Sequence, residues 1–312
     1  MGDYIVLIIG VLSAGIGGEL FVRGVIGMAH WMRVSPGIIG ATVAAFATSS
    51  PELSVAINAA IERQPQISLG DVLGSNIVNV GLVLGLSLVI SGIQSPRDSV
   101  RRDFPIALIT PIVIGVLALD GILSRLDGFI LLGMFGTWMI TVLVEVRKQQ
   151  SAAEEMLGEP RFKFAIAFSV VGLCFLITAG HLIVIAAKGI ALSFGIDEFV
   201  IGATLVAMGT SVPELATAII SKVRGHEEIG LGTILGSNIF NSLWVVGIAA
   251  ILFPITVNWQ EVAIALVFGL LSIAFTFPSS NGLIERRRGV LLLLLYAVYV
   301  VAILQKISTP IN

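Results

Sequence analysis

One stretch of the sequence occurs twice, at residues 39–53 and at residues 201–215. Ten of its fifteen positions are identical at a constant offset of 162. Each copy places hydroxyl residues, a proline and a glutamate within an otherwise apolar run, as Thr-Ser-Ser-Pro-Glu at 48–52 and as Thr-Ser-Val-Pro-Glu at 210–214. A carboxylate in such a run is costly in hydrocarbon and indicates a functional site. The duplication therefore predicts two related halves that each contribute one copy of that site.

The composition places these copies in a membrane. Of the 312 residues, 56% are hydrophobic and 12% are charged, and the mean hydropathy is +1.01. Soluble domains have about 25% charged residues, so we predict an all-α membrane protein. Ten runs are long enough to cross about 30 Å of hydrocarbon as transmembrane helices. They lie at residues 4–30, 37–61, 70–91, 104–120, 126–146, 162–193, 199–221, 230–253, 259–277 and 288–305.

The charges in the loops predict the orientation. With both termini outside, thirteen of the 18 Lys and Arg residues fall in loops that face the cytoplasm, as the positive-inside rule requires. The Met-Gly-Asp-Tyr start lacks the basic region of a cleaved leader, so the first run is interpreted as a helix. We expect a multi-pass protein of the cell (plasma or inner) membrane.

The polar segment 147–161 divides the chain into halves. We interpret it as a cytoplasmic linker between residues 1–146 and residues 162–312. Each half contains five predicted spans, an odd number, so the second half must enter the membrane from the opposite side. Inverted repeats of this kind are typical of secondary transporters, whose substrate site lies near the midplane where the repeats meet.

The first duplicated motif contains ligand atoms for a hard cation. A proline inside a helix removes one donor, so carbonyls near Ala47 and Gly209 are expected to lack their usual partner. Those carbonyls, the motif hydroxyls and the carboxylates of Glu52 and Glu214 are the oxygen ligands that Ca²⁺ and Na⁺ prefer. The alternative is a structural kink in which each glutamate bonds a neighbouring helix. The duplication argues against it, because packing alone gives no reason to repeat a buried acid.

A second duplicated motif starts at Gly70 and matches its copy at seven of ten positions with the same offset. Its Gly-Ser-Asn core supplies small residues for close helix approach and further oxygen atoms. Asn79 and Asn241 are predicted as ligands, with helix packing as the alternative. Asn76 and Asn238 are predicted to cap or cross-link helices instead.

Other polar residues inside the predicted spans have two interpretations each. Glu19 and Arg23 are four residues apart in the first run and are expected to form an internal ion pair, with a role in gating as the alternative. Asp71, whose offset position is Thr233, is interpreted as an acid at a helix N-terminus, with a role at an entrance as the alternative.

Enzymatic functions lack their motifs. The sequence contains no His-Glu-x-x-His metal motif and no phosphate loop, and its three histidines do not cluster with the motif serines. We therefore predict no enzymatic activity. A cation channel on the same repeat is the remaining alternative, and its flux would not depend on a counter-ion gradient.

The paired motifs resemble the α-repeats of the sodium/calcium exchanger family, a branch of the calcium/cation antiporter superfamily, in its prokaryotic type. The resemblance covers both motifs, the five-plus-five arrangement and the short central loop. It implies that helices two, three, seven and eight form the ion-binding core and that the long helices one and six slide across it. It also implies the ion ligands, position by position. The metal ligands are Glu52, Glu214, Asn79 and Asn241, with Thr48, Ser49, Thr210, Ser211, Ser75, Ser237 and the carbonyls of Ala45 and Ala207 in the sodium sites.

The sequence departs from the family at two positions. Ala47 stands where glycine is usual, and Asn241 stands where close archaeal exchangers often have aspartate. Two carboxylates neutralise one Ca²⁺, two Na⁺ or two H⁺, so a third Na⁺ would leave the site positive. We predict a secondary antiporter that exchanges Ca²⁺ for Na⁺ by alternating access, with an H⁺/Ca²⁺ or other divalent cation exchanger of the same fold as the alternative. The ions are substrates. No cofactor, nucleic acid or obligate protein partner is expected, and the lipid bilayer is the expected surrounding.

Overall fold

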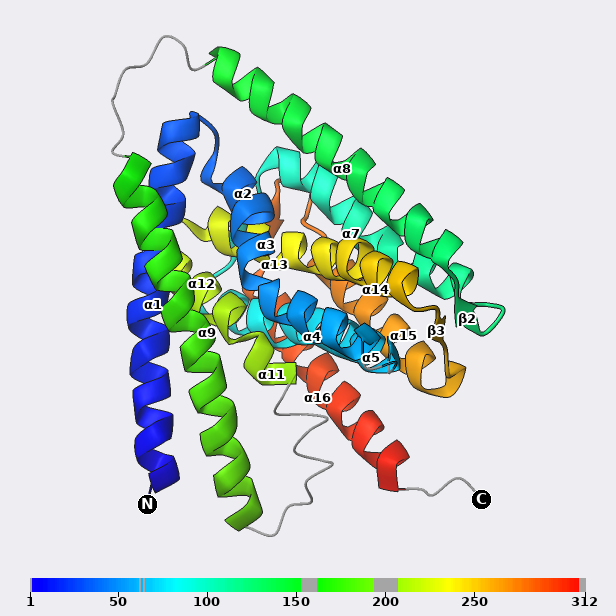
Figure 1. Ribbon diagram of the computed structural model, residues 1–312. Coiled ribbons are helices and arrows are strands. Elements are labelled where there is room, and N and C mark those ends of the chain that lie inside the picture. Colours follow the sequence, from blue (N-terminus) through cyan, green and yellow to red (C-terminus); the bar gives the residue numbers. More distant parts are fainter. Residues whose placement is uncertain (1, 62, 64, 153–161, 194–206, 309–312) are drawn as a thin grey trace.

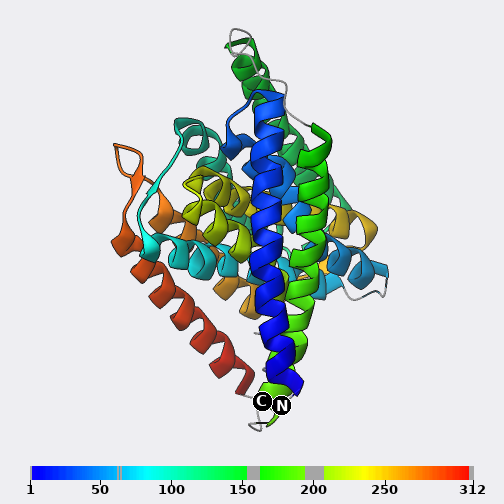
Figure 2. The same cartoon turned by 90° about the vertical axis from the view of Figure 1, so that its left-hand side faces the viewer.

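Two long helices lie side by side along one edge of the molecule (Figures 1 and 2). The computed structural model describes residues 2–61, 63, 65–152, 162–193 and 207–308. Helix α1 spans Gly2–Met32 and helix α9 spans Phe162–Ser193, and the two run antiparallel. A Cβ atom on Gly172 of α9 would lie 2.4 Å from the backbone nitrogen of Phe21, so the close approach of the two backbones requires glycine at this position.

Broken helices occupy the centre of the first half. The second predicted run folds as α2 (Pro36–Ile39), η1 (Gly40–Ala44), α3 (Ala45–Thr48) and α4 (Ser50–Ile61). The third run folds as α5 (Pro65–Ile77), η2 (Val78–Leu84) and α6 (Gly85–Ile90). The η segments are π-helical turns, which are rare and occur frequently at functional sites.

The corresponding part of the second half is broken in the same way. Its segments are α11 (Ala207–Thr210), α12 (Val212–Val223), α13 (Glu227–Ile239), η4 (Phe240–Val245) and α14 (Val246–Leu252). The start of the predicted run 199–221, and with it residues 201–206 of the duplicated stretch, lies outside the described residues.

Four further helices surround this centre. They are α7 (Arg97–Leu117), α8 (Arg125–Ala152), α15 (Trp259–Thr276) and α16 (Arg286–Ser308). Helix α8 continues to Ala152, into the segment predicted as a linker from residue 147. The side chains of Gln149 and Gln150 hold these last turns, because they accept from the Ser35 backbone nitrogen at 2.8 Å and donate to the Met32 carbonyl at 2.9 Å. The remainder of the predicted linker, residues 153–161, lies outside the described residues.

Four short strands connect the halves and were not predicted from the sequence. Strand β1 (Ile93–Gln94) pairs antiparallel with β4 (Leu283–Ile284), and β2 (Ile122–Leu123) pairs antiparallel with β3 (Ile255–Thr256). Each strand has two residues, too few for the alternation of polar and apolar residues that identifies a strand in a sequence. Each pair joins a connection of the first half to one of the second.

The helical membrane class is confirmed. Every one of the ten predicted runs is helical in the described residues. By length and apolar composition alone, five helical segments of the described chain can cross a membrane, and a bent pair of helices, α2–α3 with α4, adds a sixth. The five are Gly2–Met32, Gln66–Ile90, Arg125–Gln150, Lys163–Ile183 and Glu227–Leu252. The inverted relation of the halves and their division at residues 147–161 stay predictions.

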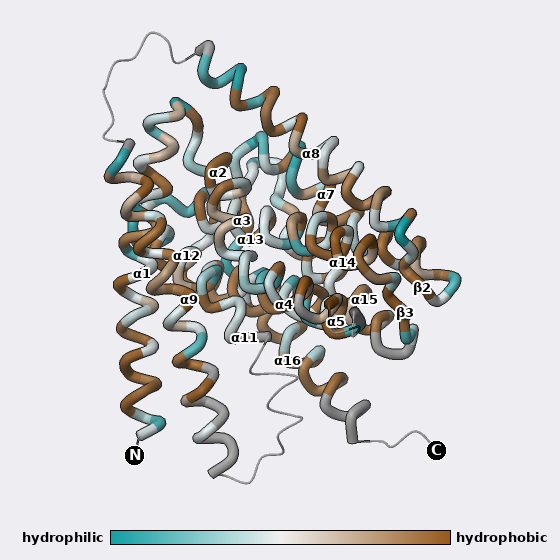
Figure 3. The backbone as a smooth tube through the Cα atoms, in the orientation of Figure 1, coloured by the Kyte–Doolittle hydropathy of each residue, from teal (hydrophilic) through white to brown (hydrophobic). Residues whose placement is uncertain are grey.

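The polar part of the bundle lies at its centre. Figure 3 shows apolar residues along α1 and α9 and paler or polar segments where α3, α4, α12 and α13 approach one another. The first turn of α1 and the last turn of α16 lie at the same end of the molecule (Figures 1 and 2). This agrees with the prediction that both termini share one side, and the choice of the outer side stays a prediction.

Candidate cation-binding site

The two duplicated proline motifs break their helices at equivalent serines. Ser49 has φ −84° and ψ 6°, and Ser211 has φ −86° and ψ 5°. Each serine lies two residues before a proline, which has no N–H to continue the helical hydrogen bonds. The chain bends by 40° at the first break. Glu52 and Glu214 follow in the first turns of α4 and α12, and both side chains are 0% exposed.

The carbonyl that faces the site in the first half is that of Ala45. It accepts from the Ser49 backbone nitrogen at 2.9 Å and lies 3.4 Å from Thr48 Oγ1 and 3.5 Å from Ser237 Oγ. The Ala47 carbonyl, which was predicted to lack its usual backbone partner, accepts instead from the Ser50 hydroxyl at 2.7 Å. Ser50 thereby replaces the N–H that the proline removed.

The second half treats its freed carbonyl differently. Val212 occupies the position that corresponds to Ser50 and has no hydroxyl to donate. The Gly209 carbonyl instead lies against α9, where a Cβ atom on Gly180 would be 2.7 Å from it. Ala207 begins α11, and the surroundings of its side chain lie outside the described residues.

Hydroxyl pairs join the first motif of each half to the second motif of the other. Thr48 Oγ1 lies 3.3 Å from Ser237 Oγ, and Thr210 Oγ1 lies 3.3 Å from Ser75 Oγ. Ser237 also donates to Glu214 Oε1 at 3.2 Å. The two pairs are related by the same offset of 162 as the sequence motifs, so the structure brings together the hydroxyls that the sequence singled out.

Asn76 and Asn238 cross-link the halves, as predicted. Asn79 Nδ2 donates to Asn238 Oδ1 at 3.2 Å, and Asn241 Nδ2 donates to Asn76 Oδ1 at 3.3 Å. Asn238 Nδ2 donates to the Asn76 carbonyl at 3.1 Å, and Asn76 Nδ2 donates to Ser242 Oγ at 2.7 Å. These bonds engage the amide nitrogens of Asn79 and Asn241 and leave their side-chain oxygens for another partner.

Buried oxygen atoms without a hydrogen-bond partner gather at this centre. We call the six residues that carry them the oxygen cage. Its seven unpartnered atoms are Ser49 Oγ, Glu52 Oε1, Glu52 Oε2, Asn79 Oδ1, Ser211 Oγ, Glu214 Oε2 and Asn241 Oδ1. Every cage residue is at most 3% exposed. Buried polar atoms are nearly always hydrogen-bonded, and a set of acceptor oxygens without donors is the arrangement that a hard cation satisfies.

The charge of the cage is not neutralised by a neighbouring base. Among the described residues, no Lys, Arg or His forms an ion pair with Glu52 or Glu214. The Ser75 hydroxyl lies near Glu52 and the Thr48 hydroxyl lies near Glu214, without the geometry of a hydrogen bond to the unpartnered atoms. The described residues contain no cluster of three His, Cys, Asp or Glu side chains, so a cation held there would take its other ligands from hydroxyls, amides and backbone carbonyls.

Three features of the site were missed in the sequence. Asn79 lies in the π-helical turn η2 and Asn241 in η4, and no residue pattern predicted either turn. Ser242, the partner of Asn76, stands where the first half has Val80. Thr217 of α12 is 0% exposed with an unpartnered Oγ1. Its spacing of three residues from Glu214 was the available signal, since residues at i and i+3 share a helix face.

Aromatic packing holds η4 against α8. The rings of Phe135 and Trp138 lie 4.9 and 5.9 Å from the ring of Phe240, centroid to centroid, in edge-to-face geometry. Trp244 packs on Phe135 at 5.1 Å. These contacts hold the turn that carries Asn241 in place against α8.

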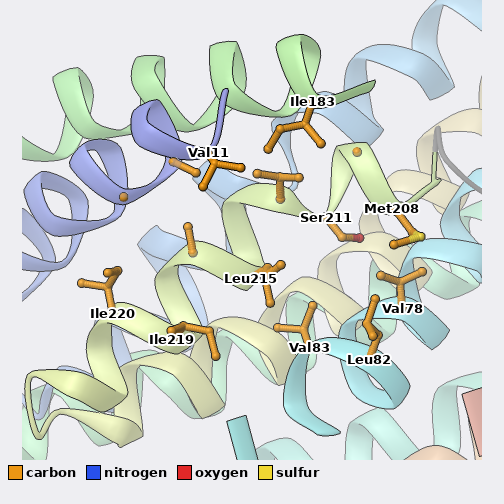
Figure 4. A pocket seen from close by; sticks show the side chains of 15 residues that line it. Val11, Val78, Leu82, Val83, Ile183, Met208, Ser211, Leu215, Ile219 and Ile220 are labelled. Carbon is orange, nitrogen blue, oxygen red and sulfur yellow. The ribbon is translucent and has the colours of Figure 1, made fainter. Parts of the chain in front are cut away.

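An apolar cavity of about 370 Å³ reaches the cage from the α1–α9 side. It lies between α1, α9, α11, α12 and η2, and Ser211 contributes the one polar side chain among the described residues that line it. Figure 4 shows the Ser211 hydroxyl among apolar side chains such as Val11, Ile183 and Leu215. The cavity therefore lies between the cage residue Ser211 and part of the length of α1 and α9.

The predicted pair of Glu19 and Arg23 is present and extends beyond α1. Arg23 donates to Glu19, and Arg224 at the end of α12 also donates to Glu19, with 2.9 Å between Arg224 Nε and Glu19 Oε2. The Glu19 side chain is 26% exposed. The ion pair thus links a long outer helix to a helix that carries a cage glutamate.

Comparisons with known proteins show the family to which the chain belongs. A family model described as sodium/calcium exchanger protein matches residues 3–144 and 164–305. The inner membrane protein YrbG of Escherichia coli is 35% identical over 257 residues, which are 80% of this chain and 79% of that protein. The sodium/calcium exchanger MaX1 of Methanosarcina acetivorans is 27% identical over 96% of this chain and 98% of its own length.

A solved structure extends the likeness to three dimensions. The sodium-calcium exchanger NCX_Mj, soaked with Na⁺ and Sr²⁺, has a TM-score of 0.82 and 31% sequence identity, covering 96% of this chain and 98% of its own. The family match includes both copies of both duplicated motifs. The chain therefore belongs to the sodium/calcium exchanger protein family, a family of membrane transport proteins and not of enzymes.

Proposed function

We propose that this chain exchanges Ca²⁺ for Na⁺ across a membrane by alternating access. The observation that carries the proposal is the oxygen cage, with its seven buried and unpartnered oxygen atoms. Hard cations take their ligands from carboxylate, amide and hydroxyl oxygens, and the cage contains all three kinds. Two buried carboxylates without a basic partner match the charge of one Ca²⁺.

Ca²⁺ would bind between the four central side chains of the cage. Glu52 and Glu214 supply charge, and Asn79 and Asn241 supply amide oxygens. The cross-links through Asn76 and Asn238 orient those amides. This arrangement keeps the ligand positions fixed without placing a positive side chain beside the ion.

Na⁺ would use the same glutamates together with the hydroxyls around them. One group contains the Ala45 carbonyl, Thr48, Ser49 and Ser237, and the other contains Ala207, Thr210, Ser211 and Ser75. The hydroxyl pairs at 3.3 Å place members of each group side by side. Because the glutamates serve both ions, bound Na⁺ and bound Ca²⁺ exclude each other, which is the requirement for exchange.

Alternating access would follow from the charge of the empty cage. Two unpaired carboxylates are costly to carry through a closed, dry state, so the protein changes face only with cations bound. The antiparallel helices α1 and α9 would slide across the core, along the apolar cavity that reaches Ser211. We place the chain in the cell membrane as a multi-pass protein with both termini outside.

The names of relatives support the ion assignment. MaX1 is called a sodium/calcium exchanger, CaxA of Alkalimonas amylolytica a putative antiporter, and NCX_Mj a sodium-calcium exchanger. The test is ⁴⁵Ca²⁺ uptake into proteoliposomes loaded with Na⁺ and diluted into Na⁺-free buffer. Uptake above that of protein-free liposomes supports the proposal, and uptake that does not depend on the Na⁺ gradient contradicts it.

Proton-coupled exchange is the second candidate, and Asn241 is the observation that favours it. With an amide at this position the cage holds two carboxylates, which two protons neutralise as completely as one Ca²⁺ does. Burial of a carboxyl group favours its neutral form. A matched set of proteoliposomes with an acid interior and no Na⁺ separates the two candidates, because only a proton-coupled exchanger accumulates Ca²⁺ in that set.

A further inference from the structure

A polar stripe runs along α5 into η2 and ends at Asn79 of the oxygen cage. Ser68, Asp71, Ser75 and Asn79 are separated by three, four and four residues, a spacing that keeps them on one helix face. With a rise of about 1.5 Å per residue, Asp71 lies roughly 6 Å and Ser68 roughly 10 Å along the helix from Ser75. The stripe therefore leads from the cage to the beginning of α5.

The outer two members of the stripe have unsatisfied oxygen atoms. Ser68 is 0% exposed, and its Oγ has no hydrogen-bond partner. Asp71 Oδ2 is also buried without a partner, although the side chain as a whole is partly exposed. Among the described residues no Lys, Arg or His pairs with Asp71. Its carboxylate thus has one buried oxygen that no donor in the described residues satisfies.

Asp71 is close to the cage without belonging to it. Glu52 interacts electrostatically with both Glu214 and Asp71, so both of these carboxylates are close enough to Glu52 to repel it. Among the described residues, the three carboxylates do not form a metal-binding cluster, so Asp71 lies apart from the pair of glutamates. Asp71 is therefore a neighbour of the two cage glutamates and not a member of the cage.

The outer two members of the stripe have no counterpart in the second half. The offset positions of Ser68 and Asp71 are Gly230 and Thr233. The Thr233 hydroxyl is satisfied, because it donates to the Ile229 carbonyl at 2.9 Å. The first half therefore extends the polar surface beyond the cage, and the second half does not.

We propose that Ser68 and Asp71 form an accessory cation site, the α5 station, at one mouth of the oxygen cage. It binds Na⁺ or Ca²⁺ weakly and passes the ion to Ser75 and Glu52. The station rests on the proposed exchange of these ions and adds an asymmetry to it, since one face of the membrane has the station and the other lacks it. It also supplies a third negative charge near a cage that has Asn241 in place of an acid.

The test measures each face of the membrane separately. Right-side-out and inside-out membrane vesicles containing the full chain are loaded with Na⁺, and the external Ca²⁺ concentration that gives half-maximal uptake is determined. An entrance lined by charges of one sign raises the local cation concentration by about tenfold or more, and Asp71 supplies one of these charges. Asp71→Asn is therefore expected to raise the half-maximal concentration about tenfold in one vesicle orientation and less than about twofold in the other.

Two variants and a matched control keep this result specific. Asp71→Glu preserves the charge and is expected to preserve the one-sided affinity, and Ser68→Ala is expected to weaken it on the same face. The control is Asp120→Asn, which removes a carboxylate from the turn before β2. This turn lies at the same end of the molecule as the beginning of α5, because β2 pairs with β3 and Gln66 of α5 donates to Thr256 of β3. Asp120→Asn should leave both affinities unchanged. A shift of equal size on both faces, or no shift, would overturn the station.

A binding measurement separates failure of the station from failure of the exchange function. In purified Glu52→Gln/Glu214→Gln protein the cage is neutral, and equilibrium ⁴⁵Ca²⁺ binding is measured with and without Asp71→Asn. The station predicts weak residual binding that Asp71→Asn removes and Asp120→Asn retains. If wild-type vesicles show no Na⁺-driven uptake, the exchange function fails and this assay alone decides the station. Residual binding that is absent, or that survives Asp71→Asn, contradicts it.

Discussion

The two helix breaks have nearly the same backbone and different neighbours. Ser49 and Ser211 differ by 2° in φ and 1° in ψ, and the glutamates that follow them are equally buried. Yet the first break satisfies its freed carbonyl internally through Ser50. The second, with Val212 in that place, turns the Gly209 carbonyl against Gly180 of α9.

The two halves differ at residues that surround the oxygen cage and agree at the cage residues themselves. At the offset of 162, Asp71 corresponds to Thr233, Val80 to Ser242 and Val55 to Thr217. The cage residues Ser49, Glu52 and Asn79 are instead matched by identical residues. A cation that is bound equally from two sides needs matched ligands, whereas the routes to it can differ. The cage residues are therefore matched between the halves, and the residues around the cage are where the halves differ.

The matched glutamates give the largest expected effect. Glu52→Gln and Glu214→Gln are each expected to lower Na⁺-driven ⁴⁵Ca²⁺ uptake at least about 100-fold, because the loss of one charged ligand removes roughly 3 kcal/mol of cation binding. The two variants should be equally impaired. A variant that keeps more than a tenth of wild-type uptake would show that its half of the cage does not hold the ion.

Thermal unfolding separates this effect from misfolding. A ligand that binds the native state stabilises it by about 2.7 kcal/mol at a concentration of 100 times its Kd. Wild-type protein in detergent should therefore unfold at a higher temperature when Ca²⁺ is added. Both variants should retain the ion-free unfolding temperature and lose the response to Ca²⁺.

The glycines of the two long helices give the second largest effect, and here the halves should differ. Gly10 of α1 and Gly172 of α9 are related by the offset of 162. A Cβ on Gly172 would meet the Phe21 backbone at 2.4 Å, whereas one on Gly10 would meet the movable Ile183 Cγ1 at 2.8 Å. Gly172→Ala should cost about 3 kcal/mol through overpacking. Gly10→Ala should be near neutral, since the gain in helix propensity of about 1 kcal/mol offsets a smaller strain.

The unfolding temperature in detergent measures this difference. Gly133→Ala on α8 is the control, because nothing lies within 4 Å of its Cβ position, and it should be unchanged or slightly stabilised. Equal losses for Gly10→Ala and Gly172→Ala would mean that both sides of the α1–α9 contact are equally rigid, and the comparison of the halves would not extend to these helices.

The sequence predicted the breaks because covalent chemistry determines them, whereas the residues of the cage were predicted from the duplication and from the family resemblance. Proline lacks an N–H wherever it stands, so Pro51 and Pro213 locate the breaks. The capture of the Ala47 carbonyl by Ser50 was not predicted, since it depends on a side-chain rotamer. The π-helical turns at Asn79 and Asn241 were also missed. They change the hydrogen bonding by one residue, and the periodicity of an almost wholly apolar run does not reveal such a change.

The cross-linking asparagines sharpen the comparison at a smaller scale. Asn76→Ala removes the bonds to Ser242 and Asn241, and Asn238→Ala removes those to Asn79 and the Asn76 carbonyl. Each change leaves buried polar groups unsatisfied and is expected to lower the free energy of unfolding by about 2 kcal/mol. Each should also weaken Ca²⁺ binding, because the amide of Asn241 or Asn79 is then free to rotate.

A paired measurement of unfolding temperature and ⁴⁵Ca²⁺ affinity tests this prediction. Ser242→Ala is the matched control, since it removes one of the bonds of Asn76 and none to a cage residue. It should lower stability by about 1 kcal/mol and leave the Ca²⁺ affinity unchanged. If Ser242→Ala weakens Ca²⁺ binding as much as Asn76→Ala does, the cross-link acts through general stability and not by orienting Asn241.

The smallest expected effect concerns Ser50, which the second break replaces by Val212. Ser50→Ala removes the donor to the Ala47 carbonyl and should lower the free energy of unfolding by about 1 kcal/mol. Val212→Ser adds a hydroxyl at the corresponding position, where it can reach the Gly209 carbonyl as Ser50 reaches that of Ala47. The new hydrogen bond stabilises the fold and the smaller buried apolar surface destabilises it, by about 1 kcal/mol each, so stability should change little. If Ser50→Ala is neutral as well, the carbonyl is satisfied from elsewhere, and the two breaks are equivalent in energy despite their different neighbours.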